Sequence, residues 1–274
     1  MMKSLIAVEA RIFNPEIGGG ISRVIISLAE NLSQLDQGAE EYVFVAWDNA
    51  EGWLGKYIGG PCRLHMVAVP GSNGRPAGTP GSATHKSDGT IESLGADLVH
   101  FPMQNAYLTS CPSIYHPHDL QHVHMPEYFD ADTLRWRLIV YRAYSYQAKF
   151  VCVETDWMKD DVVKKLDVPP DNVAVIPIAP PSLPSISMTS WAALAAAQMA
   201  GFARFIFYAT QTWRHKNHFR LLEALQFLKQ QEGLVIPLVC SGHQNEFFPE
   251  IQAKVSACRL EEQVRFLGFV ARPS

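Results

Sequence analysis

The 274-residue sequence predicts an α/β fold with largely parallel sheets. Short apolar runs of strand type alternate with segments in which apolar residues recur at helical spacing. Three consecutive glycines, residues 18–20, stand between the first strand and the first helix. A proline-rich stretch at residues 179–187 interrupts the alternation, which then starts again. Strands that alternate with helices in this way are typical of parallel sheets covered by helices.

The part before the proline-rich stretch contains most of the predicted elements. Its first helix is the clearest, because Val24, Leu28 and Leu32 recur at helical spacing. Residues 71–90 are rich in Gly, Ser, Thr and Pro and predict a surface loop. Strands are predicted at residues 5–8, 42–47, 64–69, 97–101, 113–116, 150–153 and 173–176. Helices are predicted at residues 21–35, 132–149 and 157–166.

The part after the proline-rich stretch repeats the pattern on a smaller scale. It predicts helices at residues 191–199, 219–230 and 248–258, and strands at 204–208, 236–240 and 264–267. A doubly wound nucleotide domain needs two β-α-β-α-β halves, and only about one half is present. We therefore expect a first domain at residues 1–178, a linker and connecting helix at 179–203, and a second domain at 204–274 that is truncated.

Composition excludes several classes of protein. The net charge is −4 with acids and bases mixed along the chain, so no basic surface for nucleic acid is expected. The five cysteines form no C-x-x-C pair, which argues against a zinc ribbon or redox motif and favours a reducing, cytoplasmic compartment. No apolar run is long enough for a signal peptide or a membrane span. Peripheral contact with a membrane stays open, because arginines alternate with aromatic residues in the predicted helix at 132–149.

The three glycines are compatible with a bound phosphate. Glycine lets a backbone approach a ligand closely, and a helix N-terminus offers free N–H groups and the positive end of its dipole. The order is not G-x-G-x-x-G, so the dinucleotide fingerprint is absent. A tight turn would explain one glycine but less easily three.

Residues 113–129 are the densest polar stretch, with His116, His118, His122 and His124 grouped around Asp119. One interpretation is a metal-dependent hydrolase built on His116, His118 and His122. The remaining histidines show no second group of metal-ligand type. Asp119 directly follows His118, so the H-x-H-x-D-H spacing of a metal site is not met. We therefore expect a substrate site without a metal. At least one of His122 and His124 is expected to be an ordinary helix or loop residue.

Two cations, Arg214 and Lys216, fall between a predicted strand and a predicted helix. Ligands gather at the carboxyl ends of strands in open α/β sheets, so this pair is suited to a diphosphate. The alternative is a solvated loop in which Asn217 caps the following helix.

Taken in chain order, these segments resemble glycosyltransferase family 4, whose members have the GT-B fold of two Rossmann-like domains. The stretch from His118 to His122, with Pro126 and Phe129, resembles the H-D-x-Q-H…P-x-[FY]-F motif of a mannosyltransferase-like branch. The other segments that carry the resemblance are residues 18–32, 153–180, 208–224, 238–242 and 264–268. Together they cover nearly the whole chain.

The resemblance implies an activity. Family members transfer a sugar from a nucleotide-sugar donor to an acceptor, with retention of anomeric configuration and without a catalytic metal or other cofactor. It implies a GDP- or UDP-linked donor, mannose as the transferred sugar, and a glycan or lipid-linked acceptor of polysaccharide biosynthesis. The location that it implies is the cytoplasm, with peripheral contact at the inner face of the membrane left open.

The resemblance also implies donor-binding residues. Lys216 matches the lysine that stabilises the leaving diphosphate, an electrostatic role. Many members carry an arginine five residues before that lysine, but this position is Gln211 here, and Arg214 is expected to replace it. The other implied donor-binding residues are Gly19, Gly20 and Gly242.

On the opposite wall of an expected interdomain cleft, His118 matches the histidine that faces the transferred sugar, and Asp119 is expected to hold it in place. Gln121 and His122 are expected on the acceptor side. The family's paired glutamates lie later in the second domain than this chain reaches, so the fragment alone is expected to be inactive. A non-catalytic sugar- or nucleotide-binding remnant of the fold is the remaining alternative.

Overall fold

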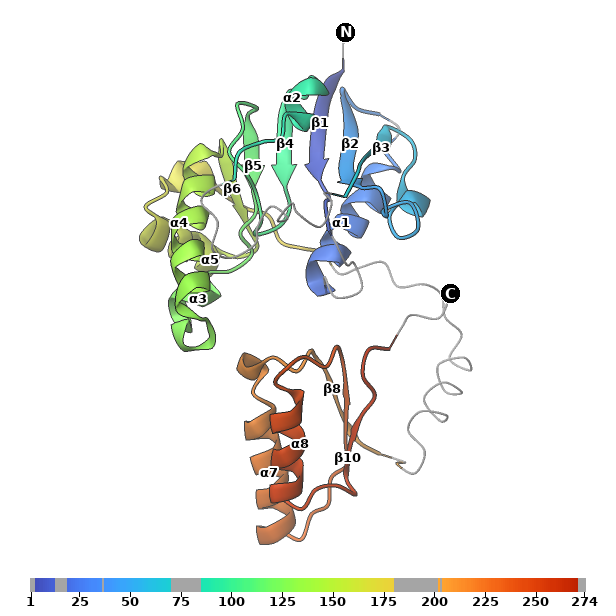
Figure 1. Cartoon of the computed structure of the whole chain (residues 1–274), viewed down its shortest axis with the longest axis vertical. Helices are drawn as coiled ribbons and strands as arrows, with labels where there is room; N and C mark the ends of the chain where they lie inside the picture. The colour runs from blue at the N-terminus through green and yellow to red at the C-terminus, as the bar shows by residue number, and fades with distance from the viewer. Residues whose placement is uncertain are drawn as a thin grey trace. The chain divides into compact units, whose positions relative to one another are not determined.

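The structure, a computed structural model, describes residues 3–12, 19–35, 37–69, 85–179, 202 and 204–270. The chain divides into two compact units, Met1–Ser182 and Leu183–Ser274. Each unit contains one parallel sheet with helices packed on it (Figure 1), so the predicted α/β class is confirmed. No helix in the described part of the chain has the length and apolar character that a membrane span requires.

The first unit is built on seven strands in the order β3-β2-β1-β4-β5-β6-β7, and every neighbouring pair is parallel. Strand order reverses between β1 and β4, and ligands of doubly wound folds bind beyond the carboxyl ends of the strands at such a switch point. The strands are β1 (Ser4–Glu9), β2 (Glu40–Trp47), β3 (Cys62–Val67), β4 (Leu98–Phe101), β5 (Ser113–Tyr115), β6 (Phe150–Val153) and β7 (Val173–Val175).

Helices cover both faces of this sheet. Side chains alternate between the faces along a strand, so Ala7 and Val8 of β1 belong to different cores. Helix α1 (Gly19–Leu32) buries Ile25 in the core that contains Val8. Helices α4 (Ala131–Gln147) and α5 (Asp156–Leu166) bury Tyr141 and Val162 in the core that contains Ala7.

Short elements connect the strands to these helices. Two single-turn helices, α2 (Thr90–Ser93) and α3 (Gln121–His124), were not predicted, because four residues are too few to show helical periodicity. The described part of the unit also contains three 3₁₀ turns, η1 (Gly55–Tyr57), η2 (Pro126–Tyr128) and η3 (Pro170–Asn172). Thr155 begins α5 by accepting a hydrogen bond from Met158 N at 3.1 Å, and this N-cap fixes the chain directly after β6.

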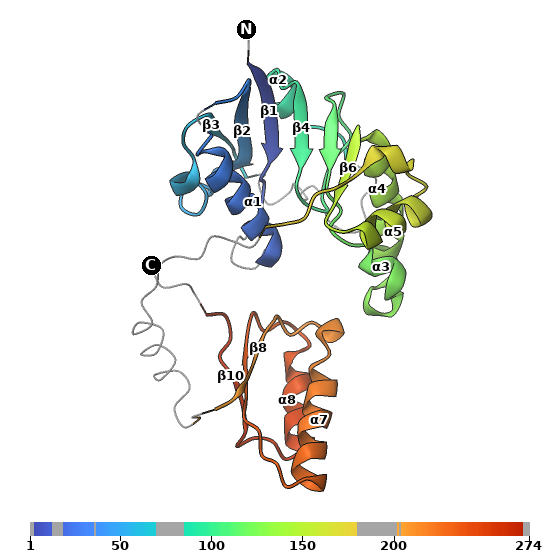
Figure 2. The same ribbon diagram turned by 180° about the vertical axis from the view of Figure 1, so that it is seen from behind.

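The second unit has three parallel strands in the order β10-β9-β8. Helices α7 (His218–Gln231) and α8 (Phe248–Ala257) lie side by side on one face of the sheet in both views (Figures 1 and 2). The strands are β8 (Ile206–Ala209), β9 (Leu238–Ser241) and β10 (Val264–Phe266), and the 3₁₀ turn η4 (Arg214–Lys216) follows β8. The predicted helix at 191–199, most of the proline-rich stretch and most of the loop at 71–90 lie outside the described residues.

Candidate active site

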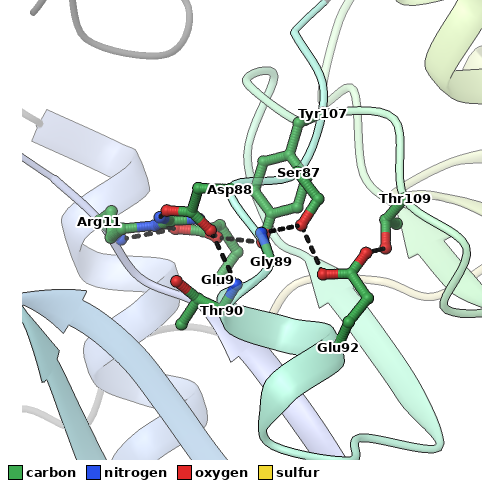
Figure 3. Close-up of polar contacts among 9 residues, drawn as sticks. All are labelled: Glu9, Arg11, Ser87, Asp88, Gly89, Thr90, Glu92, Tyr107 and Thr109. Atoms are coloured by element: carbon green, nitrogen blue, oxygen red, sulfur yellow. Dashed lines mark hydrogen bonds and ion pairs between the residues drawn. The ribbon is translucent and has the colours of Figure 1, made fainter.

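A buried ion pair between Glu9 and Arg11 lies at the switch point, at the carboxyl end of β1 (Figure 3). The Arg11 guanidinium donates to both carboxylate oxygens of Glu9, from Nε and Nη2, at 2.8 Å each. Its Nη1 donates to Asp88 Oδ2 at 2.7 Å, and the Tyr107 hydroxyl donates to Glu9 Oε2 at 2.8 Å. The Arg11 side chain is only 8% exposed and that of Glu9 only 6%. The network therefore joins β1 to the segments before α2 and after β4.

The charge states of Arg11 and Tyr107 in this network are fixed at any ordinary pH. Burial by itself would lower the pKa of Arg11, but the hydrogen bond and charge of Glu9 raise it above its usual value. Burial raises the pKa of Tyr107, and the neighbouring Glu9 raises it further. The Arg11 guanidinium thus remains charged and the Tyr107 phenol remains neutral. The network therefore forms a wall of the site and does not supply a proton.

A cavity of about 240 Å³ lies against this wall. Its lining comes from the carboxyl ends of β1, β2 and β4 and from the first turn of α1. Gly19 and Gly20 begin α1 and are exposed; a Cβ on Gly20 would meet no atom within 4 Å, whereas Gly18 lies outside the described residues. The lining residues are Glu9, Arg11, Ile12, Ile21, Trp47, Met103, Gln104, Asn105, Ala106 and Tyr107.

The sequence interpretation missed this network entirely. Glu9 and Arg11 stand at the end of an apolar strand, and charged residues in that position are a signal that could have found them. Tyr107 and Asp88 could not have been found in this way, because they are 98 and 77 residues distant from their partners.

A second cluster lies along the same edge of the sheet, after β4, β5 and β6. His118 Nδ1 is 2.7 Å from Glu154 Oε1, and His118 Nε2 is 2.9 Å from the carbonyl oxygen of Pro102. His116 Nε2 is 3.2 Å from the same oxygen of Glu154. Burial alone would raise the pKa of Glu154, but hydrogen bonds and charge from both histidines lower it to about 2. The carboxylate is therefore ionised at any working pH.

The backbone at His118 is unusual. Its φ of 63° lies in the left-handed region, which costs a non-glycine residue roughly 1–3 kcal/mol and is concentrated at functional sites. The tight turn closes with Asp119 N donating to Pro117 O at 2.8 Å. The Asp119 carboxylate accepts a hydrogen bond from Gln121 N at 3.3 Å and does not hold the His118 ring. The expectation for Asp119 is thus corrected: Glu154 holds the ring.

His122 lies in the core rather than at the site. Its side chain is fully buried, and its ring centre is 4.6 Å from that of Tyr141. Burial lowers its pKa to about 4, with smaller contributions from Arg137 and His124, so the ring is neutral. In this structure His122 is therefore not available for direct contact with an acceptor, and it does not join His116 and His118 as the hydrolase alternative requires. Gln121, beside it, is half-buried.

Among the described residues, the set with ligand atoms close enough for a metal is His116, His118 and Glu154, whose atoms lie within 4.8 Å of one another. The two rings, however, are stacked, with centres 4.2 Å apart and planes only 21° apart. The lone pair of an imidazole nitrogen lies in its ring plane, and Zn–N bonds are about 2.0–2.1 Å long. Planes so nearly parallel meet far from both rings, so one ion cannot be bound well by both nitrogens. The geometry instead suits an ion pair.

In the second unit, Arg214 and Lys216 lie on η4, between the carboxyl end of β8 and the start of α7. Both side chains are exposed, and neither forms an ion pair with any described residue. The Tyr208 hydroxyl donates to Lys216 O at 2.6 Å, which fixes the backbone of the turn. Asn217 is the N-cap of α7, as one interpretation predicted, and accepts from Arg220 N at 3.3 Å.

Gly242 follows β9 at the same edge of the small sheet. Its φ is 138°, and an added Cβ would lie 2.2 Å from the carbonyl oxygen of Thr210, beyond β8. Glycine is required here because two backbones approach each other closely. Gln211, where many family members would carry arginine, accepts a hydrogen bond from Trp213 Nε1.

The comparisons with known proteins agree with this geometry. The family model described as Glycosyltransferase Family 4 matches residues 18–179, more than half of the chain. The chain belongs to glycosyltransferase family 4. A search of curated proteins finds no match.

Solved structures place this family 4 member among GT-B glycosyltransferases. HepE of Anabaena, in complex with UDP and glucose, superposes with a TM-score of 0.62 at 16% identity, over 98% of this chain and 70% of that one. A glycosyltransferase from Rickettsia africae superposes with a TM-score of 0.60 at 13% identity, over 99% of this chain and 69% of that one. WaaG, a glycosyltransferase involved in lipopolysaccharide biosynthesis, superposes with a TM-score of 0.55 at 13% identity, over 97% of this chain and 70% of that one. Likeness at such identities establishes the fold.

For this family 4 glycosyltransferase, the family match contains Gly19, Gly20 and the His118–Glu154 cluster. Arg214, Lys216 and Gly242 lie beyond the match, in the unit that only the structural likeness covers. Their roles in donor binding therefore stay predictions.

Proposed function

We propose that this glycosyltransferase transfers a hexosyl group from a nucleotide sugar to a glycan or lipid-linked acceptor, with retention and without a metal. The observation that carries the proposal is the exposed pair Arg214 and Lys216 at the carboxyl end of β8. As the sugar leaves, negative charge grows on the diphosphate, and fixed cations that meet this charge lower the barrier.

The position of the pair supports the assignment. Helix α7 begins two residues after Lys216, and the N–H groups and dipole at a helix N-terminus favour an anion. The two cations form no ion pair with the described residues, so a diphosphate would not have to displace a carboxylate. In this proposal Lys216 contacts the leaving diphosphate, Arg214 supplies the second cation, and Gly242 lines the donor pocket.

The first unit supplies the remaining residues of the proposal. Exposed Gly19 and Gly20 leave room for a phosphate at the start of α1. The cavity at the switch point is the proposed place of the acceptor, and the His118 cluster is proposed to face the transferred sugar. HepE was solved with UDP-glucose, so this is the first donor to test, and GDP-mannose, implied by the branch resemblance, is the second.

The decisive experiment compares Lys216→Ala with Lys229→Ala. Lys229 lies in the last turn of α7, at the opposite end of the same helix, and donates to the Arg259 carbonyl. Donor hydrolysis and transfer would be followed with both donors, and the anomer of the product read by NMR. We expect Lys216→Ala to lower kcat by about 10²–10³-fold, the usual loss when a donor to developing charge is removed, and Lys229→Ala to have little effect.

The outcomes separate the alternatives. Wild-type-like turnover by Lys216→Ala would refute the role of that lysine. Binding of the donor without hydrolysis or transfer under any condition would favour a non-catalytic remnant. A product of inverted configuration would refute retention, and loss of activity on treatment with a chelator would refute metal independence.

A further inference from the structure

We propose that Glu154 is a positioning residue that holds the His118 ring in its doubly protonated form across the ends of β4, β5 and β6. The part of this inference that concerns catalysis rests on the proposed function. The family resemblance assigned no role to Glu154, which stands 36 residues from the histidine that it contacts.

The two hydrogen bonds of His118 define its proton count. Nε2 lies 2.9 Å from the Pro102 carbonyl oxygen, which can only accept. Nδ1 lies 2.7 Å from Glu154 Oε1, which also accepts, because the pKa of that carboxyl is lowered to about 2. An imidazole that donates from both nitrogens is an imidazolium. The ring is thus a cation, fixed at both ends, with a side chain only 12% exposed.

The surrounding titratable groups leave one carboxylate beside His118, and His116 Nε2 lies 3.2 Å from the same Glu154 oxygen. His116 stacks on the ring from the end of β5. His100, on β4, has its pKa lowered to about 4, chiefly by burial and then by the charges of His116 and His118, so it stays neutral. Asp119 directs its carboxylate to Gln121 N instead. Among the described residues, Glu154 is therefore the carboxylate that balances the charge of His118.

The pairing also explains how the turn is retained. The left-handed backbone at His118 costs free energy. Such a strained residue persists only where contacts with its surroundings hold it in place. Two hydrogen bonds from one ring, to groups after two different strands, supply that constraint. Glu154 itself stands between the end of β6 and Thr155, the N-cap of α5, so its backbone is held on both sides.

The direct test is the protonation state of each ring nitrogen. Imidazole ¹⁵N shifts of the full chain would be recorded at neutral pH for the wild type and for Glu154→Gln. We expect both nitrogens of His118 to be protonated in the wild type. In the variant, the glutamine amide can donate to Nδ1, so we expect Nδ1 to lose its proton while Nε2 keeps its bond to Pro102.

A matched control exists in the same unit. Asp161 Oδ2 lies 2.7 Å from His124 Nε2, an equivalent carboxylate–imidazole pair that does not touch His118. Asp161→Asn should alter the ¹⁵N shifts of His124 and leave those of His118 unchanged. If the donor is turned over, Glu154→Gln should lower kcat at least about tenfold, the scale seen when the carboxylate that orients a functional histidine is lost, and Asp161→Asn should stay within about twofold.

A singly protonated His118 in the wild type, or shifts that do not change in Glu154→Gln, would overturn the proposal. So would a Glu154→Gln enzyme with wild-type kcat and an unchanged pH profile. Failure of the wild type to transfer any tested sugar would count against the proposed function instead, and the ¹⁵N shifts would still decide the role of Glu154 in holding the ring.

Discussion

The two units arrange their charged side chains at the carboxyl edge of the sheet in opposite ways. In the first unit, Arg11 is buried and held by two carboxylates, and His118 is held by Glu154 and Pro102. In the second unit, Arg214 and Lys216 are exposed and form no ion pair with the described residues. The first edge is fixed before any ligand arrives, whereas the second keeps its cations available.

The cost of desolvation explains the difference. A charge removed from water needs a partner, because an uncompensated buried charge is strongly destabilising. Exposed cations carry no such cost, and exposed ion pairs are worth only about 0–1 kcal/mol, so leaving Arg214 and Lys216 unpaired sacrifices little stability. The comparison therefore predicts that changes to the buried charges at the edge of the first sheet alter folding, while changes to the exposed cations of the second unit alter binding.

The largest expected effect on stability is at Arg11. Arg11→Met leaves the Glu9 carboxylate buried without its cation, which should cost about 3–5 kcal/mol. The measurement is hydrogen exchange of the β1 amides, which reports the free energy of opening for this unit alone.

Arg63→Met is the matched control for Arg11→Met. Arg63 lies 3.7 Å from Glu41, and both side chains are about half exposed, so its loss should cost less than about 1 kcal/mol. Equal effects of the two changes would refute the distinction between buried and exposed charges.

The next effect concerns acid stability. The pKa of Glu154 is lowered from the usual 4.5 to about 2, so its ionised form stabilises the folded unit above pH 4.5. This contribution, about 3 kcal/mol, is lost as the pH falls from 4.5 through 2. Glu154→Gln should therefore lower stability at neutral pH and flatten its decline over that range, as measured by acid titration of β6 hydrogen exchange. Parallel curves for the two proteins would contradict this.

The smallest expected effect is that of ionic strength on the binding of UDP. Raising the salt from about 0.01 to about 0.15 M shortens the screening length from about 30 to 8 Å, which weakens attraction between exposed charges. Binding of UDP, measured by calorimetry, should weaken several-fold in the wild type and less in Arg214→Ala. The ¹⁵N shifts of His118, which is mostly buried, should not respond. Binding of UDP that does not change with salt would show that the exposed cations do not attract the donor.

The positions of most secondary-structure elements could be read from the sequence, because periodicity is a local property of the chain. Gly19 and Gly20 at the start of α1 and the cations after β8 lie in the strand-to-helix connections where the sequence placed them, and their roles in donor binding stay predictions. The loops that carry His118 and Lys216 were thus located correctly, without knowledge of what each side chain contacts.

The partners of the site residues could not be read in the same way. His118 was expected beside Asp119, but its ring contacts Glu154 and Pro102, on other strands. His122 was expected on the acceptor side, yet it packs in the core against Tyr141. In both cases the position in the sequence did not indicate which residues the side chain contacts in the fold.

The sequence by itself determined the strands, the main helices and the strand ends at which functional side chains gather, because these follow from local spacing and from the direction of a parallel strand. Only the tertiary structure decided which charges are paired. Parallel order brings the ends of β1 and β4, and of β4, β5 and β6, to one edge, and charge pairs such as Arg11 with Asp88 form across long stretches of chain. Burial then makes each such pair necessary, since a charge in the interior cannot be left to water.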